Sequence, residues 1–192
     1  MYAVYARYRG PGRRRAELVS ASAAALSGMA GCENIRVVDV DSIVGTMDSP
    51  ISTTALLMAL ISAKHWAIGI SVANPASMPD AESLEAAAKE QLTGVPRAGS
   101  IRAAVLGARP DAQSRAKDIM AVFALLQHVL ARRSPQGREA TALMRDGWSQ
   151  IEAAAELGIT KQAMSQRLAA AGWHAEEAGW RLAVNVLERA AG

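Results

Sequence analysis

Four polar side chains between residues 161 and 166 have the types and the spacing that suit them to reading DNA bases. Residues about one turn apart lie on the same face of a helix. One helix face therefore holds Lys161, Gln162, Ser165 and Gln166. Glutamine pairs with N6 and N7 of adenine, lysine with O6 and N7 of guanine or with a phosphate, and serine adapts to several partners. This pattern predicts a base-reading helix over residues 161–171.

A second set of side chains is suited to phosphate contacts beside this face. Ser149 and Gln150 begin a preceding helix, expected over residues 150–157, where free N–H groups favour an anion. Thr160 can cap the second helix, and Arg167 is a further phosphate candidate. The predicted DNA-binding residues are therefore Ser149, Gln150, Thr160, Lys161, Gln162, Ser165, Gln166 and Arg167.

The residues between the two helices predict a helix-turn-helix, the unit that lays its second helix in the major groove of DNA. Gly158 stands where the chain must turn with positive φ, and Ile159 fills the corner. Ala154 is small enough for a close helix crossing, while Met164 and Leu168 fall on the inner face of the second helix. A plain helical hairpin with its polar residues in water is the alternative.

Length and composition fit one large domain or two small ones with a proper core. The chain has 192 residues, of which 51% are hydrophobic and 4% aromatic, and its net charge is +3. The excess lies in residues 1–40, whereas residues 131–192 carry eight Lys or Arg against seven acids. A single copy of the C-terminal part would hold phosphate weakly, so we expect a homodimer that doubles the phosphate contacts.

The chain is expected to be a soluble cytoplasmic protein with no membrane partner. Its single cysteine, Cys32, excludes an intramolecular disulfide and suits a reducing cytosol. The longest apolar run, residues 55–63, is too short to span a bilayer and ends at Lys64 and His65. The first residues lack a signal-peptide pattern because their basic cluster follows the apolar part.

Periodicity along the chain predicts alternating strands and helices, then helices alone. This order favours an α+β fold: an N-terminal α+β domain over 1–110, a connecting helix over 111–133 and an all-α domain over 134–192. The connecting helix either packs on the sheet or forms a dimer interface. The expected elements are strands 1–8, 35–44, 66–73 and 100–106; helices 13–29, 52–64, 80–92 and 111–133; a turn over 45–50; a loop over 75–79; a segment 137–146 that leads into the helix-turn-helix; and a last helix from residue 175.

Three of these helices have an expected apolar face. The spacing of apolar residues defines each face. The faces are Leu18, Ala21, Ala25 and Met29 in helix 13–29; Ile119, Val122, Phe123, Leu126 and Leu130 in helix 111–133; and Trp180, Val184 and Leu187 in the last helix.

These features together resemble the SatD-like family, whose members join a domain similar to the palm of nucleotidyl cyclases to a C-terminal helix-turn-helix. The C-terminal resemblance is the more specific, and the helix-turn-helix is also similar to region 4 of sigma factors. The C-terminal resemblance to the SatD-like family runs through ARRSPQGREA (131–140), GWSQIEAAAELGITKQAMSQRLAAAGW (147–173) and EEAGWRLAVNVL (176–187). The N-terminal likeness rests on element order, on DVDSIVG (39–45) at the family's acidic hairpin and on WAIGISV (66–72). It implies a ferredoxin-like, palm-like N-terminal domain.

The sequence departs from a catalytic palm at the metal-binding positions. Cyclase-type palms hold two metal ions with carboxylates on the first strand and at the hairpin. Here Ala6 and Arg7 stand where an acid is wanted. Asp39 and Asp41 are two residues apart on the expected strand, so they share a strand face, where they would hold a single metal weakly or simply end the strand and bond a turn. We therefore expect no enzyme, no cofactor and no metal. The three histidines, His65, His128 and His174, lack ligand spacing, and Cys32 lacks an activating base.

Two further groups have open interpretations. The Arg13, Arg14 and Arg15 run either contacts an anion or begins a solvated helix. Trp148, Trp173 and Trp180 are expected to pack the C-terminal core rather than to stack on bases.

The sequence thus predicts a bacterial transcription regulator that binds double-stranded DNA as a homodimer. The N-terminal domain would supply dimer contacts and a small-molecule or nucleotide effector site. Two alternatives stay open: a nucleotide sensor or enzyme in which Asp39 and Asp41 hold a metal, and a protein-docking module that uses the helix-turn-helix as its surface.

Overall fold

The computed structural model describes residues 1–192 except 33, 75, 77–79 and 108, so the expected loop over 75–79 lies outside the described residues apart from residue 76. The chain forms two compact units. The sheet unit is Met1–Ala124 with Leu182–Gly192, and the helical unit is Leu125–Arg181. The boundaries fall inside two long helices, α4 (Ala112–Ala131) and α8 (Trp173–Ala191). The expected division into an α+β domain over 1–110, a connecting helix over 111–133 and a helix-turn-helix domain over 134–192 stays a prediction.

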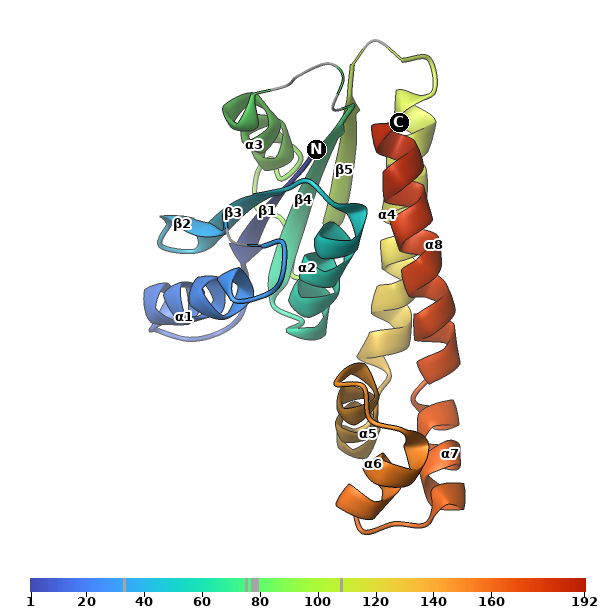
Figure 1. Cartoon of the computed structure of the whole chain (residues 1–192). Coiled ribbons are helices and arrows are strands. Elements are labelled where there is room, and N and C mark those ends of the chain that lie inside the picture. The colour runs from blue at the N-terminus through green and yellow to red at the C-terminus, as the bar shows by residue number, and fades with distance from the viewer. Residues whose placement is uncertain (33, 75, 77–79, 108) are drawn as a thin grey trace. The chain divides into compact units, whose positions relative to one another are not determined.

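The sheet unit has a ferredoxin-like core with one added strand (Figure 1). Strand order is β2-β3-β1-β4-β5, with β1 antiparallel to both of its neighbours and β5 parallel to β4. The expected α+β class is confirmed. The elements are β1 (Tyr2–Tyr8), α1 (Arg15–Ser27), β2 (Arg36–Asp39), β3 (Ser42–Met47), α2 (Pro50–Ser62), β4 (Trp66–Ala73), α3 (Ala81–Glu90) and β5 (Ile101–Leu106).

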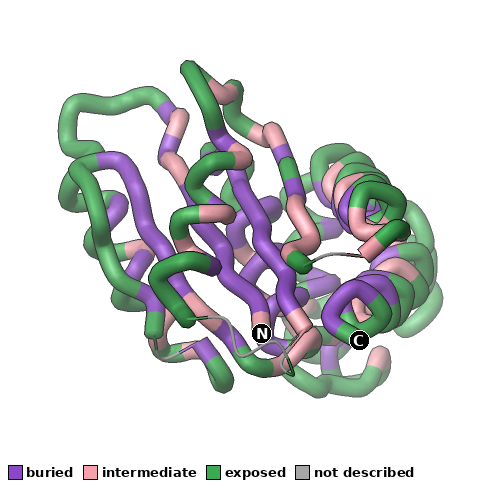
Figure 2. Tube along the Cα trace, turned by 90° about the horizontal axis from the view of Figure 1, so that it is seen from above, coloured by how far each residue is buried: buried purple, intermediate pink, exposed green. Residues whose placement is uncertain are grey.

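Helices cover both faces of the sheet, which explains why β1 and β4 are buried along most of their length (Figure 2). α3 lies on one face, and α1 and α2 lie on the other (Figure 1). Leu84 and Ala88 of α3 pack against Ala3 and Tyr5 of β1, so alternate residues of β1 point toward α3. On β4, Ser71 Oγ donates a 2.6 Å hydrogen bond to the Leu84 carbonyl oxygen.

The expected single strand over 35–44 is wrong, because this segment is the β2–β3 hairpin. β2 and β3 pair antiparallel, with an irregular register between Val37 and Asp39, and the chain reverses at Val40 and Asp41. The expected turn over 45–50 is also wrong, since β3 continues to Met47. The alternation in IRVVDVDSIV continues through the reversal, so periodicity alone did not locate it.

The expected apolar face of the first helix is wrong. In α1 the buried residues are Val19, Ala23 and Leu26, whereas Leu18 is 45% exposed. Alanine is compatible with either register, so the Ala-rich sequence defines the apolar face poorly.

The expected last helix is partly corrected. It starts at Trp173, and of its three expected core residues Leu187 is buried while Trp180 and Val184 are half-buried. The expected face of α4 is confirmed, since Ile119, Val122, Phe123, Leu126 and Leu130 are all buried.

The helical unit contains α5 (Pro135–Arg145), α6 (Gln150–Glu156) and α7 (Lys161–Ala170), with the parts of α4 and α8 that fall within 125–181. Ser134 caps α5 by accepting a bond from the Gly137 N–H, and Pro135 at the first helical position needs no donor. A small cluster holds the three helices together: Ala140, Ala153, Ala154, Met164, Leu168 and Trp173.

None of the described helices is long and apolar enough to cross a membrane.

Candidate nucleic-acid interface

The turn between α6 and α7 follows from its glycine. Gly158 has a φ of +62°, and its N–H donates to the Ala155 carbonyl while the Ile159 N–H donates to the Ala154 carbonyl. These two bonds form a Schellman motif, in which the next apolar residue turns back onto the helix. Ile159 is accordingly half-buried against the cluster of the three helices. The expected turn chemistry is therefore present.

α7 has one buried face and one exposed polar face. Met164 and Leu168 are fully buried in the cluster, which fixes how the helix is rotated about its axis. Thr160 caps the helix, since its Oγ1 accepts a 3.1 Å bond from the Ala163 N–H. The structure brings the four predicted base-reading residues together on the exposed side of α7: Lys161, Gln162, Ser165 and Gln166.

The predicted phosphate contacts are less uniform. Arg167 is half-buried, as is Gln150, whereas Ser149 is exposed. Ser149 forms a capping box: its Oγ accepts a bond from the Glu152 N–H, and Glu152 accepts a 2.8 Å bond from the Ser149 N–H. These two bonds with Ser149 hold the pKa of Glu152 below its ordinary value. A carboxylate thus already occupies one N–H group at the end of α6 where a phosphate was expected.

A buried ion network supports this helical unit, and sequence reasoning missed it. The Arg133 side chain is 2% exposed and that of Glu176 is 5% exposed, and Arg133 Nη2 lies 2.5 Å from Glu176 Oε2. Arg133 Nε also donates a 2.7 Å bond to the Ala171 carbonyl, just after α7. Arg145 of α5 donates two further bonds to Glu176, of 2.8 and 2.9 Å. The network therefore joins α5, the end of α7 and α8.

Burial lowers the pKa of Arg133, against the opposing effect of Glu176, with Arg145 acting in the lowering direction. The sequence held one signal for this network. Arg133 stands seven residues after Leu126 and three after Leu130, so it continues the apolar spacing of the expected helix 111–133, and Glu176 stands three residues after Trp173. A charged residue at an apolar-stripe position indicates a buried partner.

The three tryptophans of the helical unit divide between core and surface. Trp173 is buried in the cluster, as expected, and Trp180 is half-buried. Trp148 corrects the expectation: it is 38% exposed, next to Ile151, which is 63% exposed. The Trp148 N–H donates to the Leu143 carbonyl in a second Schellman motif, at the end of α5, so its backbone is fixed while its ring stays accessible.

In the sheet unit, the acids of the hairpin do not form a pair. Asp39 ends β2 and its Oδ1 accepts a bond from the Val40 N–H, whereas Asp41 lies after the reversal and is bound by Arg7. The expectation that the two share a strand face fails because the chain turns between them. Among the described residues no group of three or more His, Cys, Asp or Glu side chains is placed to hold a metal.

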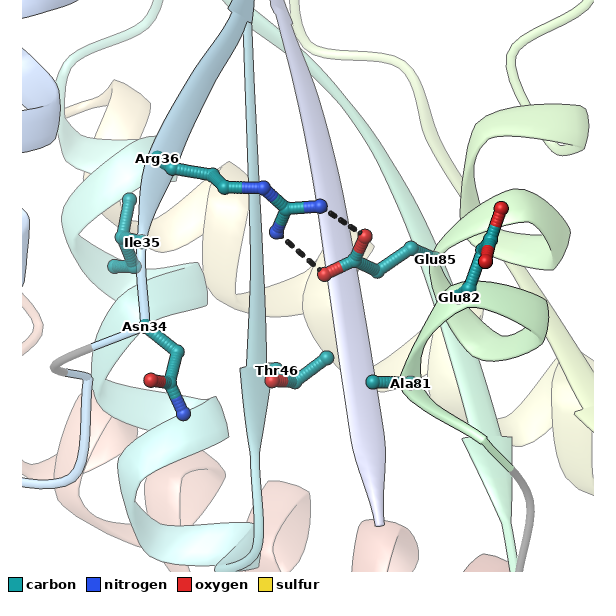
Figure 3. Close-up of a pocket in the computed structure, with 7 residues that line it drawn as sticks. All are labelled: Asn34, Ile35, Arg36, Thr46, Ala81, Glu82 and Glu85. Carbon is teal, nitrogen blue, oxygen red and sulfur yellow. Dashed lines mark hydrogen bonds and ion pairs between the residues drawn. The ribbon is translucent and has the colours of Figure 1, made fainter.

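A polar groove lies between β2 and α3 on the sheet face that α3 only partly covers (Figure 3). Arg36 spans it from β2 and donates a bidentate pair of bonds, 2.6 and 2.5 Å long, to Glu85 of α3. The Glu85 hydrogen bond raises the pKa of Arg36, against a smaller effect of burial. Arg36 and Glu85 thus satisfy each other's hydrogen-bonding groups. Its lining residues are Asn34, Ile35, Arg36, Thr46, Ala81, Glu82 and Glu85.

Comparisons of the chain with protein-family models, curated proteins and solved structures find no match. The resemblance to SatD-like proteins and to sigma region 4 therefore stays a prediction.

Proposed function

We propose that this chain is a sequence-specific DNA-binding protein, a bacterial transcription regulator that acts as a homodimer. The observation that carries the proposal is the exposed face of α7. Lys161, Gln162 and Gln166 carry long polar side chains on a helix whose opposite face is locked by Met164 and Leu168. A rigid helix with bidentate hydrogen-bonding groups on its free side suits insertion into the major groove.

In this proposal the capping residues and Arg167 set the register on the DNA backbone. Thr160 and Ser149 use their oxygens as acceptors within the helix caps. Each hydroxyl therefore retains its hydrogen for a phosphate oxygen. Glu152 opposes a phosphate at the end of α6, so we expect Arg167 and Lys161 to contribute most of the electrostatic attraction.

The modest charge of the C-terminal part supports a homodimer. Residues 131–192 carry eight basic side chains against seven acidic ones, and Arg133 is paired with Glu176. One copy therefore offers few cationic side chains to the phosphates of DNA. Two copies double them, and they would contact half-sites about 34 Å apart along the DNA.

The test starts with a selection of bound sequences from a random DNA pool at near-physiological salt. The enriched sequence is then titrated with Gln162→Ala, Gln166→Ala and Arg167→Ala. Each glutamine variant is expected to lose about 1–3 kcal/mol on the selected DNA and little on random DNA. Arg167→Ala should weaken both and flatten the salt dependence. Gln136→Ala on α5, also an exposed glutamine, is the matched control and should bind normally.

Two results would contradict the assignment. Equal losses on selected and random DNA for the glutamine variants would remove their base-reading role. Failure of the pool to enrich any sequence would remove the proposed function itself.

A protein-docking module is the second candidate, and the exposed Trp148 and Ile151 favour it. Glu152 and Glu156, which follow them closely in the sequence, are also exposed, so the surface around α6 carries apolar and acidic side chains, which suits a protein better than DNA. Trp148→Ala that leaves DNA binding intact but abolishes regulation in cells would assign a protein contact to this surface.

Three further parts of the proposal concern the whole chain. The ferredoxin-like order with an acidic hairpin, followed by a helix-turn-helix, supports a relation to SatD-like proteins. The engagement of Asp41 by Arg7 supports a sheet unit that performs no reaction. The single cysteine, buried at Cys32, supports a cytoplasmic location.

A further inference from the structure

Two arginines at the end of β1 converge on one carboxylate at the hairpin tip. Arg7 Nε donates bonds of 3.3 and 3.2 Å to the two carboxylate oxygens of Asp41. Arg9 Nη1 lies 3.6 Å from Asp41 Oδ2. Arg7 continues the alternation of Ala3 and Tyr5 along β1, so its side chain stands on the α3 face of the sheet, and Arg9, just beyond β1, reaches the same carboxylate. The cluster has two positive charges against one negative charge.

Asp41 is committed to these partners and to its own neighbour. Its Oδ1 accepts a 2.7 Å bond from the Ser42 hydroxyl, and Ser42 in turn accepts a 2.9 Å bond from the Tyr5 hydroxyl. Burial works against the charged form, but the Ser42 bond and the two arginines hold the pKa of Asp41 below its ordinary value. Asp41 is therefore ionised at neutral pH, and it neutralises only one arginine.

The excess charge coincides with an unsatisfied donor. Arg9 Nε is buried and makes no hydrogen bond among the described residues. A buried donor on a charged group without a partner is costly, so its presence calls for a water or an ion. The side chains of Arg9 and Arg7 are 19% and 30% exposed, which leaves the cluster reachable from solvent.

We propose that Arg7 and Arg9 form an anion site that binds a phosphate group, independently of the proposed DNA interface. A guanidinium group pairs with carboxylate or phosphate through parallel N–H bonds. Asp41 already supplies the planar carboxylate. A tetrahedral phosphate offers acceptor oxygens in several directions, so it can accept from the partly exposed guanidinium groups of Arg7 and Arg9 together. The ligand is either inorganic phosphate or the phosphoryl group of a nucleotide.

The experiment titrates the full chain with sodium phosphate, AMP or ATP, without metal and at constant ionic strength kept with sodium chloride. Binding is followed by calorimetry and by thermal unfolding. Phosphate is expected to bind and to raise the melting temperature, because a ligand of the folded state stabilises it. Arg9→Gln should weaken binding at least tenfold. Arg9→Lys, which keeps the charge and loses Nε, should weaken it less. Arg14→Gln is the control, since Arg14 is exposed in α1's cap region and should bind as the wild type does.

Asp41→Asn distinguishes a ligand site from a merely structural ion cluster. Removing the competing carboxylate frees both arginines, so phosphate affinity is expected to rise several-fold even where the variant is less stable. A nucleotide that binds tenfold more tightly than phosphate would identify a nucleotide site, and equal binding would identify a site for phosphate alone.

Three results would overturn the proposal: no phosphate effect beyond that of chloride, the same phosphate affinity in Arg9→Gln as in the wild type, or sodium acetate binding as tightly as phosphate. None of these results bears on DNA binding by α7.

Discussion

The two units of this chain stabilise themselves in different ways. The sheet unit is built on a five-stranded sheet and buries large side chains, among them Phe123, Leu57, Ile70 and Leu84. The helical unit packs mainly alanines with Met164, Leu168 and Trp173, and places an Arg–Glu pair in its interior. A small unit buries a smaller share of its surface, so individual interactions carry more of its stability. We infer that the stability of the sheet unit depends mainly on steric fit, whereas that of the helical unit depends on a buried charge pair.

The largest expected effect tests that dependence on charge. Glu176→Gln keeps the shape of the side chain but leaves Arg133 buried without its counter-charge. Breaking a buried ion pair on one side costs about 3–5 kcal/mol. Urea unfolding followed by fluorescence should show this loss in the helical unit, which holds Trp148, Trp173 and Trp180 of the chain's four tryptophans.

Two variants sharpen the same comparison. Glu177→Gln, beside Glu176 but exposed and paired with His174 at the surface, should cost about 0.5 kcal/mol or less. The double variant Arg133→Met with Glu176→Leu should recover much of the loss, because an apolar pair often replaces a buried ion pair without penalty. A loss below about 1 kcal/mol for Glu176→Gln would show that the helical unit does not rely on the network.

The next effect tests steric fit in the sheet unit. A Cβ on Gly69 would lie 2.2 Å from the carbonyl oxygen of Ala88, so Gly69→Ala must push α3 away from β4. Overpacking of this kind costs about 1–3 kcal/mol. Trp66, the one tryptophan of the sheet unit, reports the unfolding.

Gly28→Ala provides the matched control for that variant. Gly28 has a φ of −77°, and a Cβ there would come no nearer to another atom than 3.4 Å, from the Ala25 carbonyl oxygen. It should be neutral or slightly stabilising, since alanine restricts the unfolded chain more than glycine does. Equal effects of the two substitutions would mean that α3 yields easily and that fit is not limiting.

The two units also differ in how much of the fold and of the candidate site the sequence predicted. In the helical unit, local signals were sufficient: Gly158, Thr160 and the Met164–Leu168 spacing predicted the turn, the cap and the inner face, and all three are confirmed. The β2–β3 hairpin was missed because Val40 and Asp41 carry no glycine or proline to mark the reversal. The Arg133–Glu176 pair was missed because its partners are distant in sequence, and only tertiary packing brings them together.

The smallest expected effect is a pH dependence confined to the sheet unit. The partners of Asp41 lower its pKa in the folded state below the ordinary value of 3.8, so the folded state favours the ionised carboxylate. The resulting stabilisation is complete above the ordinary pKa and is lost as pH falls below it toward the folded-state pKa. The contribution should be about 1 kcal/mol or less, because the neighbouring arginines are partly solvated. Unfolding by urea, followed through Trp66 between pH 6 and about 3, measures it.

The comparison of Asp41→Asn with Asp118→Asn isolates that contribution from the general effect of acid. Asp118 lies exposed on α4, in the same unit, so its variant should follow the wild-type pH profile. Asp41→Asn should begin less stable at pH 6 and lose less on acidification, because the titrating group is gone. If both variants lose stability in parallel with the wild type, the ion cluster at the hairpin tip contributes nothing to folding. Arg7 and Arg9 would then lie near Asp41 without stabilising the sheet unit, and steric fit alone would account for the stability of this unit.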